Sequence, residues 1–156
     1  MLRFVAVVRT AISFGMEVYG VRHGYNGLLT GEVQKMGASQ RFQHHPARRH
    51  GALYGAQPRV TTVPGGVQKA AAKCRELGID GVVVVGGDGS FRGARDLTGA
   101  GVPCIGVPGT IDNDISSSEY TIGYDTAMNT AMEMIDRIRD TTESHDRCSV
   151  VEVMGR

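Results

Sequence analysis

The chain has 156 residues, a length that suits one domain able to bury a core without help from disulfide bonds. A composition of 41% hydrophobic and 21% charged residues excludes a fibrous or fully disordered protein, and 22 glycines without a collagen period indicate turns and close backbone approaches. The net charge is +1 and no apolar run reaches the roughly 18 residues of a membrane span, so we expect neither nucleic acid nor a membrane as a partner.

Apolar residues at helical spacing predict a helix over Val5–Phe14, and the alternating, β-branched stretch Met16–Val21 predicts a strand. His23–Gly31 is rich in turn residues and predicts a loop. Strong helix formers over Val67–Leu77 predict the next helix, and Gly78 is a typical residue to end it.

The second half of the chain alternates strand and helix patterns. A valine run predicts a strand at Gly81–Val85, a short helix follows from Ser90 to Leu97, and Val102–Val107 is a second buried strand. Apolar residues three and four apart predict a long helix over Tyr124–Thr142, and Cys148–Met154 is a last strand. Unalternating strands separated by helices predict an α/β fold, a parallel sheet with helices on both faces.

The cysteines, Cys74, Cys104 and Cys148, are odd in number, far apart and without a CxxC pair. The apolar N-terminal stretch contains an arginine and lacks a small-residue cleavage site, which argues against a signal peptide. We therefore expect reduced, mostly buried thiols and a cytoplasmic location.

One segment does not fit this pattern. The 43 positions between Glu32 and Glu76 hold no acidic residue, although the rate of the whole chain predicts about four. A basic arm for phosphate or nucleic acid is one interpretation. The favoured one is a poorly ordered segment over residues 38–64 that does not belong to the fold, because no aromatic interleaving or zinc-ligand pairing accompanies it.

The strongest local motif is VVVVGGDGS, Val82–Ser90, in which a buried strand runs into a glycine loop. Such a loop lets backbone N–H groups close on phosphate oxygens, and Ser90 could cap the following helix. Asp88 could hold Mg²⁺, which takes one or two carboxylates together with phosphates. The alternative is a tight turn with Asp88 as a solvated loop residue. Neither the P-loop nor the dinucleotide fingerprint is present.

A second motif, PGTIDND, follows the next strand over Pro108–Asp114. The carboxyl ends of strands in open α/β sheets are where ligands bind. It contains two carboxylates, Asp112 and Asp114, and a carboxylate close to a sugar hydroxyl can accept its proton while a neighbouring carboxylate acts near a metal. The alternative is a turn in which Asp112 or Asn113 bonds its own backbone, but the whole string beside a glycine loop favours a site.

Four strings, GGDGS, PGTIDND, TIGYDTAMNT and VEVMGR, together resemble bacterial ATP-dependent 6-phosphofructokinase, over about Val5–Leu29 and Gly66–Arg156. PGTIDND is specific to the phosphofructokinases, whereas variants of GGDGS occur in NAD kinases and diacylglycerol kinases, so an NAD- or lipid-kinase relative is an alternative. The resemblance implies ATP-dependent phosphorylation of fructose 6-phosphate to fructose 1,6-bisphosphate, a step of glycolysis.

The resemblance also implies residue roles. Asp112 is similar to the base that takes the proton from the 1-hydroxyl of fructose 6-phosphate, with Thr110 beside it and Asp114 as the acidic neighbour near the metal. Asp88 matches the Mg²⁺ carboxylate, in an ATP-phosphate loop made of Gly87, Asp88, Gly89 and Ser90.

Other matching positions contact the sugar phosphate or an effector. The implied substrate contacts are Thr110, Ile111, Asp112, Met154, Gly155 and Arg156, with Arg147 reaching the sugar phosphate of an adjacent subunit. Arg9 and Arg139 fall where family members bind an allosteric nucleotide. A homo-oligomer, a tetramer in the family, is implied as well.

Two small residues indicate the phosphoryl donor. Pyrophosphate-dependent relatives commonly have aspartate at the position of Gly89 and lysine at that of Gly109. A carboxylate at the first position would repel the α-phosphate region of a nucleotide. Because both residues are glycine here, the resemblance implies ATP.

The sequence also departs from the family. It begins just beyond the family's first strand and glycine loop, it stops at Arg156 before the second, substrate domain, and local frameshifts would explain residues 38–64. Residues 1–156 are therefore interpreted as a partial N-terminal, ATP-binding domain, with little or no turnover expected of the isolated chain. ADP production that depends on fructose 6-phosphate and is lost in Asp112→Asn would overturn that expectation. The alternative is a non-catalytic chain that binds nucleotide or docks onto an intact subunit.

Overall fold

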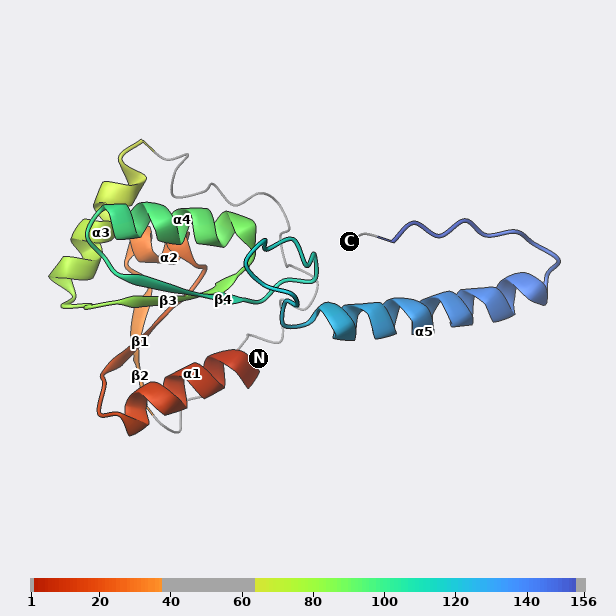
Figure 1. The fold of residues 1–156 in the computed structure, drawn as a ribbon, viewed down its shortest axis with the longest axis horizontal. Coiled ribbons are helices and arrows are strands. Elements are labelled where there is room, and N and C mark those ends of the chain that lie inside the picture. The colour runs from red at the N-terminus through yellow and green to blue at the C-terminus, as the bar shows by residue number, and fades with distance from the viewer. Residues whose placement is uncertain (1, 38–63, 154–156) are drawn as a thin grey trace. The chain divides into compact units, whose positions relative to one another are not determined.

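The structure is a computed structural model that describes residues 2–37 and 64–153 (Figure 1). The atypical segment predicted over residues 38–64 lies, apart from Pro64, outside the described residues. Helices and strands alternate along the described part of the chain, as predicted, in the order α1 Leu2–Ser13, β1 Val18–Val21, α2 Tyr25–Thr30, β2 Val33–Met36, α3 Gly66–Glu76, β3 Val82–Gly86, α4 Asp88–Gly99, β4 Cys104–Pro108 and α5 Tyr124–Glu143.

The chain divides into two compact units. The first comprises Met1–Val82 and Gly93–Ile105, and the second comprises Val83–Arg92 and Gly106–Arg156. The described parts of each unit are treated separately below. None of the helices in these parts is both long and apolar enough to cross a membrane.

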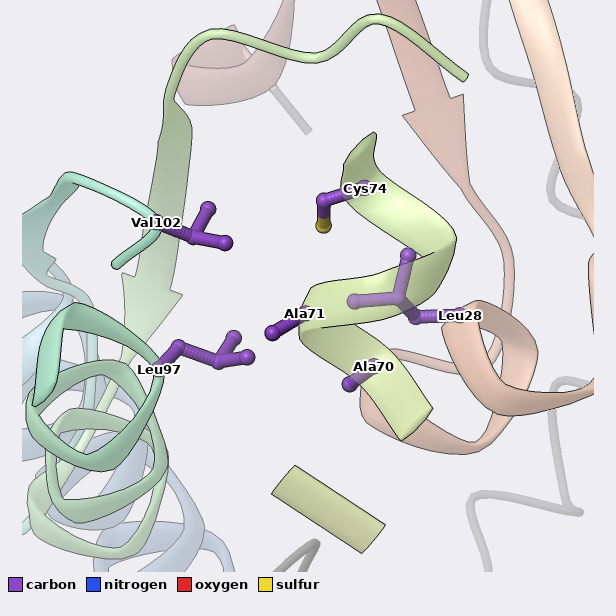
Figure 2. Packing of buried hydrophobic residues seen from close by; sticks show 6 residues of the cluster. All are labelled: Leu28, Ala70, Ala71, Cys74, Leu97 and Val102. Carbon is purple, nitrogen blue, oxygen red and sulfur yellow. The ribbon is translucent and has the colours of Figure 1, made fainter. Parts of the chain in front are cut away.

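The core of the first unit gathers around one face of α3. Ala70, Ala71 and Cys74 are completely buried, and their spacing places them on one side of the helix, as Figure 2 shows. Leu97 of α4, Val102 and Leu28 of α2 complete the cluster. Burial of a side chain such as Leu97 contributes about 1.5–3 kcal/mol. As predicted, α3 ends before Gly78, which has the left-handed φ of 64° that favours glycine.

Two sequence-based predictions in the first unit are wrong. The expected loop at His23–Gly31 contains helix α2, which Gly31 ends in a left-handed conformation. Burial of Leu28 explains why this turn-rich stretch is helical, because the helix carries that side chain into the core. Strand β2 was not expected, and it pairs antiparallel with β1 in four residue pairs from Val18↔Met36 to Val21↔Val33.

Strands β3 and β4 form a second two-stranded sheet. The Val82 N–H donates to the Pro103 carbonyl, and the Gly109 N–H donates to the Gly86 carbonyl, so the strands run in parallel. The described residues form no larger sheet. The predicted burial of the Val102–Val107 strand is confirmed at its start and wrong further along, since Val102 is 2% exposed and Ile105 67%.

The C-terminal part of the second unit consists of α5 and an extended segment. The apolar residues of α5 recur at helical spacing as predicted, but none is buried, and Met128, Met132, Ile135 and Ile138 are all exposed. The strand expected over Cys148–Met154 is wrong for residues 148–153, which form no strand. A strand needs a neighbour for its backbone hydrogen bonds, and within the described ranges this segment pairs with none.

Candidate active site

The glycine loop lies between β3 and α4 in the second unit. Helix α4 begins at Asp88, and the Gly87 carbonyl accepts the N–H groups of Ser90 at 3.0 Å and Phe91 at 3.1 Å. Ser90 therefore lies in the first helical turn and not at the cap position expected from the sequence. The start of a helix is the positive end of its dipole, which favours an anion at this turn.

The two residues just before the helix, Gly86 and Gly87, have little room for a side chain. A Cβ at Gly86 would lie 2.5 Å from Ser90 Oγ, so β3 and the first turn of α4 approach too closely for a side chain. A Cβ at Gly87 would lie 3.3 Å from Thr110 Cβ. The glycine loop therefore packs directly against the loop that follows β4, residues 109–114, which is called the acidic loop below.

A hydroxyl closes the acidic loop. Thr110 Oγ1 accepts the Asp112 N–H at 3.1 Å and lies 3.1 Å from Asp112 Oδ2, to which it donates. The turn considered as an alternative for this motif is thus present, but Thr110 closes it and not the side chain of Asp112. Asp112 is half-buried, whereas Ile111 and Asp114 are exposed.

Thr121 anchors the same loop from eleven residues away. Its side chain is almost fully buried, at 3% exposure, and its hydroxyl donates to the Thr110 carbonyl at 2.8 Å. Its N–H donates to Asn113 Oδ1 at 3.0 Å, and Asn113 has a left-handed φ of 51°. Sequence reasoning missed both functions, because a lone threonine before a helix carries no signal of a contact with a distant turn.

The two loops meet at the carboxyl ends of β3 and β4. The hydrogen bond from the Gly109 N–H to the Gly86 carbonyl, 2.9 Å long, continues the pairing of the strands to that end. An anion-binding helix start therefore lies beside a carboxylate that can accept a proton. Such a juxtaposition suits the transfer of a phosphoryl group to a hydroxyl.

Asp88 is the carboxylate nearest to the helix start. It pairs with Arg92, whose Nε lies 2.9 Å from Asp88 Oδ2. Within residues 2–37 and 64–153, no group of three or more His, Cys, Asp or Glu side chains could hold a metal ion. A metal at this loop would therefore use at most two such side chains together with ligand phosphates, and one or two carboxylates with phosphates suit Mg²⁺.

The remaining predicted site residues lie elsewhere. Arg139 of α5 and Arg147 both line an open groove of about 460 Å³ between α5 and the segment after it, with Thr142 and Glu143. Arg139 also lies 3.4 Å from Asp136. Arg9 is exposed on α1, in the first unit. The last three predicted substrate contacts, Met154, Gly155 and Arg156, lie outside the described residues.

Known proteins resemble this chain over most of its length. The sequence model of the phosphofructokinase family matches residues 3–156, a range that includes the motif-bearing stretches Val5–Leu29 and Gly66–Arg156. ATP-dependent 6-phosphofructokinase of Shouchella clausii is 52% identical over 153 residues, which are 97% of this chain and 47% of that protein. The enzyme of the same name from Bacillus subtilis is 51% identical over 154 residues, with the same coverage.

The fold is similar as well. The crystal structure of Pichia pastoris phosphofructokinase in the T-state matches 87% of this chain and 17% of its own, with a TM-score of 0.67 and 26% identity. The chain spans about half the length of the curated relatives it matches. With a family match over nearly every residue and a shared fold, the chain belongs to the phosphofructokinase family.

Proposed function

We propose that these residues form part of the active site of an ATP-dependent 6-phosphofructokinase. The reaction transfers the γ-phosphoryl group of ATP to the 1-hydroxyl of fructose 6-phosphate, giving fructose 1,6-bisphosphate and ADP in the cytoplasm. The observation that carries the proposal is the direct packing of the glycine loop on the acidic loop, seen in the approach of Gly87 to Thr110. The names of the two bacterial relatives, both ATP-dependent 6-phosphofructokinases, support it.

Each loop serves one substrate in this proposal. The ATP phosphates lie against residues 87–90, where the start of α4 offers N–H groups and a favourable dipole. The sugar lies against Thr110, Ile111 and Asp112. The oxygen of the 1-hydroxyl attacks the γ-phosphorus while Asp112 accepts the proton of that hydroxyl. Thr110 holds the Asp112 carboxylate in position by donating a hydrogen bond to it.

Asp88 is the residue that would hold Mg²⁺, and Asp114 would act near it. A bound Mg²⁺ neutralises charge that develops on the transferring phosphoryl group. The exposure of Asp88 supports this function, because the carboxylate is 47% exposed and within reach of an incoming ligand.

The donor and the wider fold complete the proposal. Glycine at positions 89 and 109, in place of the aspartate and lysine common in pyrophosphate-dependent relatives, supports ATP over pyrophosphate. The parallel pairing of β3 and β4 supports a larger parallel sheet with helices on both faces. Membership in the phosphofructokinase family disfavours the NAD- or lipid-kinase alternative.

An oligomer, a tetramer in the family, is the proposed state of the protein. The apolar residues along α5 support it, since a soluble protein normally covers such a row. Arg147 and Arg139, which line one groove, are proposed to contact a sugar phosphate and an effector nucleotide, respectively, and Arg9 an effector. Met154, Gly155 and Arg156 remain proposed substrate contacts.

The catalytic part is tested with Asp112→Asn. Transfer of ³²P from γ-labelled ATP to fructose 6-phosphate is followed over hours against a protein-free blank, because little or no turnover is expected. Whatever transfer exceeds the blank should fall about 10²–10⁴-fold when the base is removed. The affinity for Mg·ATP, measured by calorimetry, should stay within about twofold of the parent chain. Label transfer that exceeds the blank and is equal in the parent chain and the variant would contradict the proposed function of Asp112.

The donor part is tested with Gly89→Asp. The new carboxylate should weaken ATP binding about tenfold and leave pyrophosphate binding within about twofold, because the proposed repulsion acts on the α-phosphate, which pyrophosphate lacks. Gly99→Asp adds the same charge at the other end of α4, where a Cβ meets nothing within 4 Å, and serves as the control. Equal weakening by both variants would argue against a nucleotide at residues 87–90.

A further inference from the structure

A guanidinium lies one helical turn after the proposed metal-binding carboxylate. Arg92 Nε is 2.9 Å from Asp88 Oδ2, and the two side chains are 56% and 47% exposed. The acid precedes the base by four residues, which is the favourable order for an ion pair on a helix. Because the pair is open to water, it contributes little stability and can exchange partners readily.

Arg92 should affect the binding of two possible ligands, a bare divalent cation and a cation–nucleotide complex, in opposite ways. A bare divalent cation competes with the guanidinium for the same carboxylate oxygen, and the two positive charges repel each other. A nucleotide brings phosphate oxygens of the geometry that a guanidinium binds through two parallel hydrogen bonds. Those phosphates would lie at the start of α4, where Asp88 is located. Arg92, one turn further along the helix, reaches back toward this end to pair with Asp88.

We propose that Arg92 is an exchangeable partner of Asp88 that favours a cation–nucleotide complex over the bare cation. In the free chain, the guanidinium neutralises the Asp88 carboxylate and weakens its capture of a cation alone. When a cation arrives with a nucleotide, the carboxylate binds the cation and the guanidinium turns to the phosphates. This inference rests on the proposed function, since it takes Asp88 as the residue that meets the metal–nucleotide complex.

The same helix supplies a matched control. Arg95 lies three residues further on and pairs with its neighbour Asp96, with 3.1 Å between Nη2 and Oδ1. Its side chain is 77% exposed. Arg95→Gln therefore removes the same charge from α4 without touching the Asp88 pair.

The experiment compares Arg92→Gln with Arg95→Gln in the whole chain. Mn²⁺ binding is measured from the loss of the free-ion signal in electron paramagnetic resonance, and binding of Mn²⁺ with the β,γ-imido analogue of ATP is measured by calorimetry. We expect Arg92→Gln to bind Mn²⁺ alone about two- to tenfold more tightly and the Mn²⁺–nucleotide complex at least about threefold more weakly. Arg95→Gln should change both affinities less than twofold, and circular dichroism checks that each variant keeps its helices.

Opposite shifts in the two affinities, confined to Arg92→Gln, would support the inference. Shifts in the same direction, no shifts, or equal shifts in Arg95→Gln would overturn it. Asp88→Asn separates this failure from failure of the proposed function. If the parent chain binds the complex and Asp88→Asn weakens that binding, the proposed function stands whatever Arg92 does. If the parent chain does not bind the complex, or Asp88→Asn binds it equally well, the proposed function fails and the inference fails with it.

Discussion

Thr121 shows how one buried hydroxyl can hold a loop of several polar residues in place. Its side chain donates to the Thr110 carbonyl, and its N–H donates to Asn113 Oδ1. Thr110 in turn positions Asp112. The carboxylate proposed as the base is thus fixed through a residue outside its own motif.

Replacing Thr121 by valine keeps the shape of the side chain and removes the hydroxyl. We expect the free energy of unfolding to fall by about 1–2 kcal/mol, because the Thr110 carbonyl loses its donor in a half-buried place. Urea denaturation followed by circular dichroism measures this change. Thr130→Val, which removes an exposed hydroxyl that donates to the Thr126 carbonyl on α5, should change stability by less than about 0.5 kcal/mol. Equal losses in the two variants would contradict the anchoring function of Thr121.

The partly buried ring of Tyr25 predicts how the stability of the chain depends on pH. Burial raises the pKa of Tyr25 from 10.0 to about 12, and the nearby Cys104 and Asp96 add to the shift. Between these values, the unfolded chain releases a proton that the folded chain retains, so stability should fall as the pH rises from about 10 to about 12. Absorbance at the tyrosinate band should show a last ionisation step near the top of this range, and Tyr25→Phe should remove it. If Tyr25→Phe loses a step near pH 10 instead, the burial of this ring is contradicted.

At the scale of elements, helix α4 contains two glycines, Gly93 and Gly99, whose replacement should have opposite effects on stability. A Cβ at Gly93 would lie 2.6 Å from the ring of Tyr25, whereas a Cβ at Gly99 meets nothing within 4 Å. Gly93→Ala should therefore lower the free energy of unfolding by about 1–3 kcal/mol through overpacking. Gly99→Ala should raise it by up to about 1 kcal/mol through helix propensity. Thermal or urea unfolding distinguishes the two, and a stabilising Gly93→Ala would contradict the close packing of α4 on α2.

Elements with a strong local pattern could be predicted from the sequence, and those that depend on distant contacts could not. The helical spacing of apolar residues predicted α1 and α5, the strong helix formers predicted α3, and the valine run predicted β3. Strand β2 exists because β1 pairs with it, and α2 exists because Leu28 reaches the core, so neither has a pattern that stands alone.

The candidate site also has parts that a local sequence pattern predicts and parts that depend on the folded structure. Its two loops could be placed at neighbouring strand ends from their motifs and the order of the elements. The anchoring by Thr121 and the pairing of Arg92 with Asp88 could not be, because each depends on how a turn or a side chain is oriented in space. No pattern of residue types specifies the contacts of Thr121, and the four-residue spacing of Asp88 and Arg92 gives an ion pair only because α4 begins at Asp88, two residues before the predicted helix.

At the scale of the whole molecule, the chain combines a packed cluster in its first unit with an α5 that has none of its residues buried. The relatives it matches are about twice as long. Its membership in the phosphofructokinase family rests on the match over residues 3–156, and the proposed chemistry rests on the two loops at the ends of β3 and β4.

The most direct test of that proposal is an NMR titration of the ¹⁵N-labelled chain. The Mg²⁺ complex of the β,γ-imido analogue of ATP is added first, followed in separate samples by fructose 6-phosphate, NAD or a soluble diacylglycerol. The proposal predicts that the nucleotide shifts the amide signals of Gly87, Gly89 and Ser90, and that fructose 6-phosphate alone among the acceptors then shifts those of Thr110 and Asp112. Unchanged signals at both loops, or a response of the acidic loop to NAD or diacylglycerol but not to fructose 6-phosphate, would contradict it.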